Sequence, residues 1–152
     1  MFPATVERVS CNTADEINER IRRQTEANVA RFTGAGYAAI TERLRDLDQE
    51  WDIERVLETM APTISIIGMI LGLTDNRKWF VLPLVVQSFF LQHALHGWCP
   101  PIPILRRLGV RTQTEIDHEK YALKALRGDF QSIPISRSET ASPTDVLTAA
   151  HP

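Results

Sequence analysis

The sequence predicts an all-α protein built around an apolar helical hairpin, with amphipathic helices on either side. Three observations lead to this prediction: two long stretches without charge, several helix-start signals, and no alternating pattern of the kind that strands show. The chain has 152 residues, which is the size of one ordinary domain. We therefore predict a single helical domain over 1–130, with the apolar hairpin at about 53–97. The remainder, 131–152, is rich in Ser, Thr and Pro and is predicted to be an extended or mobile tail.

The composition argues against several classes of protein. The chain carries 17 Lys and Arg against 19 Asp and Glu, a net charge of −2, so it lacks the basic surplus that draws proteins onto nucleic acid. Its two cysteines make neither a disulfide framework nor a four-cysteine zinc site. The N-terminal residues run directly into charges and do not resemble a signal peptide. We expect no nucleic-acid partner and no cofactor.

The uneven distribution of charge predicts the hairpin. Residues 59–105 contain only three charged side chains, all in the short stretch 75–78, which separates two apolar runs. The first run, 59–74, has 16 residues, or about 24 Å of helix against a bilayer core of about 30 Å. Both runs are apolar on every side, so we expect lipid, the rest of the chain or a second copy to cover them. Gly68 and Gly72 are spaced to let the two helices approach closely.

Capping signals predict the flanking helices. Residues 13–16 form a capping box, from which a helix should continue to about Phe32. A second capping box at 112–115 predicts a helix to about Arg127, with Gly128 as its C-cap. These two helices account for much of the chain outside the apolar runs.

Two further segments complete the predicted fold. Apolar residues in 37–51 are spaced 3, 4, 3 and 4 positions apart, which indicates an amphipathic helix with a charged reverse face. We expect its apolar stripe to pack on the hairpin. Three of the four residues in 100–103 are prolines, and they predict an extended connector rather than a helix.

Few residues are candidates for a metal, redox or catalytic site. His93 and His96 lie on one helix face with Cys99 three positions further, an arrangement that a metal or redox protein would use. The alternative is that these side chains cap and pack a helix end, with Cys99 as a small buried group. Cys99 follows a helix C-terminus, where the dipole does not favour a thiolate. The acidic residues of 46–58 are accompanied by Arg43, Arg45 and Arg55, which favours a solvated, ion-paired face. We expect no enzymatic activity.

Several of these segments resemble a known family. Two apolar helices, a tight polar turn and the closing sequence Gly-Trp-Cys-Pro at 97–100, then Leu-Gly at 108–109, resemble the YgaP-like transmembrane hairpin domain. That bacterial domain of unknown function occurs alone or behind a rhodanese sulfurtransferase domain. Residues 91–130 and 50–55 resemble a longer single-domain branch of the family. The resemblance implies a hairpin that meets lipid, as a dimer, and implies no established activity. The rhodanese part has no counterpart here, so sulfurtransferase activity is not carried over.

We therefore predict a non-enzymatic, lipid-binding or membrane-associated protein. It would be a homodimer, either cytoplasmic or associated with the inner membrane of a bacterium, and its hairpin would contact lipid or a fatty acid-like ligand. Two alternatives stay open: a metal or redox protein built on the histidine and cysteine cluster, and a structural subunit that binds a partner. The predicted apolar wall comprises Ile64, Ile67, Ile70, Leu71, Leu84, Phe89 and Phe90, and the predicted head-group contacts are His93, His96 and Arg106.

Overall fold

The computed structural model describes residues 4–131, and all regular secondary structure in that range is helical, which confirms the all-α prediction. The predicted tail lies outside the described residues apart from Gln131. The helices are η1 (Ser10–Asn12), α1 (Asp15–Arg31), α2 (Tyr37–Gln49), α3 (Ile53–Thr74), η2 (Arg77–Phe80), α4 (Val81–His96), α5 (Ile102–Arg107) and α6 (Gln113–Arg127).

The chain divides into two compact units, each assembled from segments that are distant in sequence. Among the described residues, the hairpin unit comprises 4–22 and 51–114, and the α2–α6 unit comprises 23–50 and 115–131. The boundary falls inside α1 and near the start of α6. The prediction of one domain over 1–130 stays a prediction.

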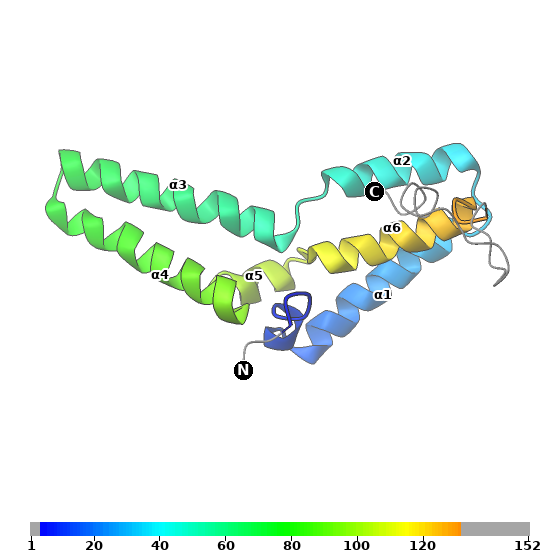
Figure 1. The fold of residues 1–152 in the computed structure, drawn as a ribbon, viewed down its shortest axis with the longest axis horizontal. Helices are drawn as coiled ribbons and strands as arrows, with labels where there is room; N and C mark the ends of the chain where they lie inside the picture. The colour runs from blue at the N-terminus through cyan, green and yellow to red at the C-terminus, as the bar shows by residue number, and fades with distance from the viewer. Residues whose placement is uncertain (1–3, 132–152) are drawn as a thin grey trace, which may run out of the picture. The chain divides into compact units, whose positions relative to one another are not determined.

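The predicted hairpin is formed by α3 and α4, which lie side by side in the hairpin unit (Figure 1). Helix α3 begins where the sequence predicts, because the Asp52 carboxylate accepts a hydrogen bond of 2.9 Å from the backbone N–H of Arg55. At the turn, the Asn76 side chain accepts from the N–H of Lys78 at 2.9 Å and starts η2. Helix α4 ends at Gly97, whose φ of 76° suits glycine.

The two glycines of α3 face the returning chain. A Cβ atom added to Gly68 would lie 2.7 Å from Cδ of Pro83, and one added to Gly72 would lie 2.8 Å from the ring of Phe80. Both glycines are buried, and only a hydrogen atom fits at either position. The close approach inferred from their spacing is therefore present in the fold.

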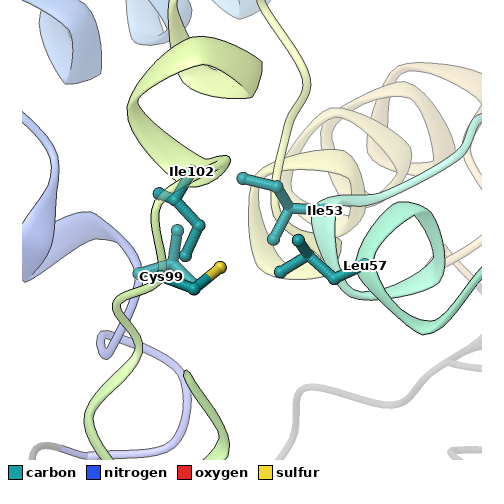
Figure 2. Close-up of a cluster of buried hydrophobic side chains, with 5 residues drawn as sticks. Ile53, Leu57, Cys99 and Ile102 are labelled. Atoms are coloured by element: carbon teal, nitrogen blue, oxygen red, sulfur yellow. The ribbon is translucent and has the colours of Figure 1, made fainter. Parts of the chain in front are cut away.

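The core of the hairpin unit lies at the base of the hairpin, away from its turn. Figure 2 shows Ile53 and Leu57 of α3 facing Cys99 and Ile102, which follow α4. Val9 belongs to the same buried cluster and brings the N-terminal segment onto it. The base is thus well packed.

The prediction of an extended connector after α4 is wrong, since α5 begins at Ile102 within the proline-rich stretch. Pro100 and Pro101 precede this helix, and Pro103 occupies its first turn. A proline is tolerated there because the backbone N–H groups of a first turn have no partner inside the helix. The helix buries Ile102 against the core of the hairpin unit.

In the α2–α6 unit, the middle of the predicted apolar stripe of 37–51 is confirmed, whereas its end residues Tyr37 and Trp51 are exposed. Its residues Ile40, Leu44 and Leu47 are buried together with Ile116 and Leu123 of α6. The stripe is therefore covered by α6 of the same unit, which corrects the expectation that it packs on the hairpin.

The two capping predictions have different outcomes. Thr13 does not cap α1, because its hydroxyl donates to the carbonyl of Val9 at 2.8 Å, and Ala14 supplies the first helical carbonyl. Helix α6 begins at Gln113, directly after the first residue of the second capping box, and Gly128 follows its last residue with a φ of 89°. The predicted extent of α6 is therefore confirmed.

Candidate functional site

A large apolar surface covers the outside of the hairpin. Each of its side chains is at least a third exposed, and the two most exposed are Leu73 at 77% and Leu84 at 68%. Side chains of this size would normally lie in a core or an interface, and a contiguous exposed patch of them marks a contact site. We call this set the apolar hairpin surface: Met60, Ile66, Ile67, Met69, Ile70, Leu73, Val81, Leu84, Val85, Phe89, Leu91 and Leu95.

Within residues 4–131, one segment is long and apolar enough to cross a membrane, judged by length and composition. It is 37–74, which contains α2 and α3, and it includes an 18-residue window with a mean hydropathy of 1.7. Only 28% of that window is buried in the structure, whereas the core helix of a soluble protein is mostly buried. Membrane association is therefore compatible with this segment.

An apolar groove of about 200 Å³ lies between α3, α4 and the turn that follows α4. Leu57 and Cys99 in its wall belong to the buried core, whereas Met60 and Phe89 belong to the apolar hairpin surface. The groove therefore connects the core with the exposed surface. Its lining residues are Leu57, Met60, Ala61, Ile64, Val86, Phe89, Phe90, Cys99, Pro100 and Pro101.

The thiol in this groove is held in its protonated form. Burial raises the pKa of Cys99 to about 11, against the opposing effect of a hydrogen bond with the backbone of Ile102, and the nearby Glu54 carboxylate raises it further. The thiol stays protonated at neutral pH, and cysteine chemistry needs the thiolate. Cys99 acts here as a small apolar wall residue.

A charged cluster sits at the base of the hairpin, and it joins three distant segments. Glu54 of α3 accepts from the guanidinium of Arg8 at 2.8 Å and contacts Nε2 of His93 in α4 at 2.8 Å. Glu54 precedes the charge-free run of α3. Partial burial acts to raise the pKa of its carboxyl group, but the hydrogen bonds from His93 and Arg8 outweigh burial, so the pKa is lowered. We call Arg8, Glu54 and His93 the base cluster.

The N-terminal segment also contacts the base of the hairpin. The Asn12 amide donates to the carbonyl of Arg8 at 2.7 Å and to that of His96 at 2.8 Å. A Cβ atom on Gly97 would lie 2.1 Å from the Arg8 carbonyl oxygen, so the backbone approach requires glycine. The base of the hairpin is therefore held by polar contacts, whereas the turn end carries exposed apolar side chains such as Leu73 and Val81.

The predicted apolar wall divides between two locations. Among the predicted wall residues, Phe89 belongs to both the groove and the apolar hairpin surface. The other six differ in how far their side chains are exposed. Ile64, Phe89 and Phe90 line the groove, Ile67, Ile70 and Leu84 are exposed, and Leu71 is half-buried.

The predicted head-group contacts have different surroundings. His93 is 1% exposed and belongs to the base cluster, whereas His96 is exposed. Arg106 is fully buried, and its guanidinium donates to the side chain of Asn18 at 2.9 Å and to the carbonyl of Val110 at 3.2 Å. Arg106 therefore ties α1 to the turn after α5 rather than presenting its charge to a ligand.

No group of three His, Cys, Asp or Glu side chains within residues 4–131 is arranged to hold a metal ion. The structure assigns His93 a carboxylate partner and places Cys99 in an apolar core. The metal or redox alternative therefore gains no support from the described part of the chain.

Sequence reasoning missed Arg8 and Glu54, and it did not identify the proline turn as a groove wall. Arg8 lies 46 positions from Glu54, and Glu54 lies 39 positions from His93. No local spacing connects residues so far apart, and the groove likewise needs the packed helices before its walls meet.

Comparison of the chain with protein-family models, curated proteins and solved structures finds no match. The resemblance to the transmembrane hairpin domain stays a prediction, and a functional proposal has to rest on the residues of this chain.

Proposed function

We propose that this protein is a membrane-associated, non-enzymatic protein whose hairpin of α3 and α4 inserts into lipid. The observation that carries the proposal is the apolar hairpin surface, which is exposed over a stretch that has no charged residue from 59 to 74 or from 79 to 96. Fully burying one large aliphatic side chain gains about 1.5–3 kcal/mol, so a dozen partly exposed ones provide a strong driving force for insertion.

Three polar side chains of the hairpin, those of Ser65, Gln87 and Ser88, have hydrogen-bond partners within it. The hydroxyl of Ser65 accepts from the Gln87 amide at 2.9 Å and donates to the carbonyl of Ala61 at 2.8 Å. On α4, the hydroxyl of Ser88 donates to the carbonyl of Leu84 at 2.8 Å. Because an unsatisfied polar group costs several kcal/mol in hydrocarbon, these internal bonds support an inserted hairpin.

Both ends of the hairpin carry groups that suit a membrane interface. At the turn, the indole N–H of Trp79 donates to the Asp75 carboxylate at 2.9 Å. At the base, the guanidinium of Arg55 lies 4.6 Å from the ring centre of Trp51. Tryptophan and charged residues at the two ends of an apolar segment favour the water–lipid boundary. The charge-free part of α3, about 24 Å long, is shorter than an average bilayer core of about 30 Å, and local thinning accommodates such a difference.

Vesicle flotation tests the proposal. The purified chain is mixed with phospholipid vesicles and centrifuged through a density gradient, and we expect it to float with the lipid. Ile67→Asp places a carboxylate on the exposed middle of α3 and should abolish flotation, because a charged residue there costs about 3 kcal/mol relative to isoleucine. Leu108→Asp is the matched control, since Leu108 is also exposed but lies outside the hairpin.

The results that would contradict the proposal are distinct. A wild-type chain that stays at the bottom of the gradient does not insert, and the structural-subunit alternative then takes its place. Equal flotation of wild type and Ile67→Asp would show that another surface binds lipid. Circular dichroism of both variants checks that the folds are unchanged.

A further inference from the structure

We propose that the groove between α3, α4 and the turn at 99–101 binds one acyl chain of a membrane phospholipid. This site is separate from the bulk lipid around the hairpin, and the proposal rests on the proposed function, because the lipid layer supplies the chain. The groove lies toward the base of the hairpin, since its wall includes core residues such as Leu57 and Cys99.

The chemistry of the walls restricts the ligand. All ten lining residues are apolar, and the single thiol among them, that of Cys99, stays protonated at neutral pH. No side chain in the wall offers a charge or an amide to a polar ligand. An apolar cavity of about 150 Å³ holds a benzene-sized guest. A groove of about 200 Å³ therefore takes a segment of a hydrocarbon chain.

The size of the groove disfavours a second copy of the protein as its occupant. A helix with its side chains is about 10 Å across, which is far too thick for this space. A single acyl chain is much thinner and enters from the side. Met60 at 36% exposure and Phe89 at 38% belong both to the groove and to the apolar hairpin surface, so a chain in the groove stays continuous with the surrounding lipid.

The position of the base cluster indicates at which end of the groove the phospholipid head group lies. Phe90 lines the groove, and its ring stacks on His93 with the centroids 6.4 Å apart and the planes inclined by 22°. Leu57, another wall residue, follows Glu54 by one turn of α3. The charged base of the hairpin is thus next to one end of the groove, which places the phospholipid head group on the base side rather than at the turn 75–78.

A photoreactive phospholipid tests the site. The full chain is reconstituted into phosphatidylcholine vesicles that contain a phosphatidylcholine with a diazirine in one acyl chain, and labelled residues are mapped by mass spectrometry. Bulk lipid labels exposed residues such as Ile70 and Leu84. Only a chain inside the groove reaches Cys99, which is 3% exposed. We expect labelling at Cys99 as well as on the exposed surface.

Two neighbouring valines of α4 give a matched pair of variants. Val86→Phe fills the groove from one wall, whereas Val85→Phe makes the same change at a position that is 44% exposed and outside the groove. We expect Val86→Phe to lower labelling of Cys99 about tenfold, because its phenyl ring occupies space that the acyl chain would otherwise fill. Val85→Phe should leave it unchanged, and Ala61→Leu, which fills the groove from α3, should repeat the loss.

The outcomes separate this proposal from the proposed function. Labelling of Ile70 and Leu84 without Cys99 in the wild type would overturn the groove site while leaving insertion intact. Absence of any labelling means that the hairpin does not insert, and both proposals then fail. Cys99 labelling that is equal in Val86→Phe and Val85→Phe also overturns the site. A free fatty acid carrying the same diazirine is a parallel arm, and stronger Cys99 labelling by it than by the phospholipid would reassign the ligand.

Discussion

At the scale of single residues, Glu54 connects parts of the chain that the sequence keeps apart. Its two carboxylate oxygens contact Arg8 from the N-terminal segment and His93 from α4. The side chain of Glu54 is 30% exposed and that of Arg8 is 24% exposed, so both charges are partly removed from water. Hydrogen bonds to a partly buried charge contribute more to stability than surface ion pairs do.

Removing the Glu54 charge should loosen the base of the hairpin. We expect Glu54→Gln to lower the free energy of unfolding by about 1–3 kcal/mol, because Arg8 then keeps a partly buried charge without its carboxylate partner. Denaturant titration of the detergent-solubilised chain measures the change. Glu58→Gln makes the same substitution at an exposed position of α3 and should have little effect. Equal stabilities for the two variants would show that the base cluster does not hold the fold.

A second carboxylate makes stability depend on pH in the α2–α6 unit. A hydrogen bond from Arg127 lowers the pKa of Asp129 below its ordinary 3.8, with burial opposing and the charges of Arg127 and Lys124 assisting. A lowered pKa in the folded state stabilises the fold above pH 3.8, and this contribution is lost as the pH falls through the folded pKa.

We therefore expect Asp129→Asn to lower the melting temperature at neutral pH and to have no effect in strong acid. The loss should be about 1 kcal/mol, the usual size for a single ion pair that water can partly reach. Thermal unfolding of both proteins over a series of pH values gives the comparison, with the exposed Asp46→Asn as a control. A difference that persists unchanged at low pH would assign the effect to packing rather than to charge.

At the scale of elements, the hairpin depends on how closely α3 and α4 approach. Gly68 faces Pro83, and a proline ring anchored in the backbone cannot move aside as a flexible side chain does. Alanine normally stabilises a helix relative to glycine, by about 0.5–1 kcal/mol. At this position the added methyl group meets Pro83 at 2.7 Å, so the steric cost should exceed the gain in helix propensity.

We predict that Gly68→Ala destabilises the hairpin by about 1–3 kcal/mol, and that Gly68→Leu destabilises it more. The melting temperature in one fixed detergent is the measurement. Gly36→Ala is the control, because a Cβ atom there has no neighbour within 4 Å. A higher melting temperature for Gly68→Ala would mean that the helices are further apart than the structure shows.

At the scale of the whole molecule, the apolar hairpin surface has to be covered when lipid is absent. Residues of both hairpin helices contribute to it, and several exceed half exposure, including Ile66, Ile70 and Leu91. Monomeric soluble proteins rarely expose apolar patches of more than a few hundred Å². Self-association through a symmetric pair is the commonest way to bury such a surface in water.

We expect the detergent-free chain to sediment as a dimer or a larger species in analytical ultracentrifugation. Ile67→Asp together with Leu84→Asp should shift it toward the monomer, since each aspartate would have to be buried in the interface. Leu108→Asp, outside the hairpin, should leave the sedimentation unchanged. A wild-type chain that is monomeric without detergent at working concentrations would contradict the exposure of this surface.

The sequence by itself determined the features that depend on neighbouring residues. The charge-free runs predicted the hairpin, Gly128 predicted a helix end, and Gly68 predicted a close approach. Each of these signals acts within a few positions, through capping, backbone conformation or the absence of a side chain. The expectation that prolines exclude a helix was wrong in the proline-rich stretch, because α5 has Pro103 in its first turn.

Only the tertiary structure decided which distant groups meet. The base cluster joins residues 46 and 39 positions apart, and the groove needs walls from α3, α4 and the turn at 99–101. The stripe of α2 was evident from the sequence, but its cover by α6 was not. Hydrophobic burial has no direction, so a pattern shows that a face will be covered without naming the segment that covers it. Which segment covers the face is determined only when the whole chain packs.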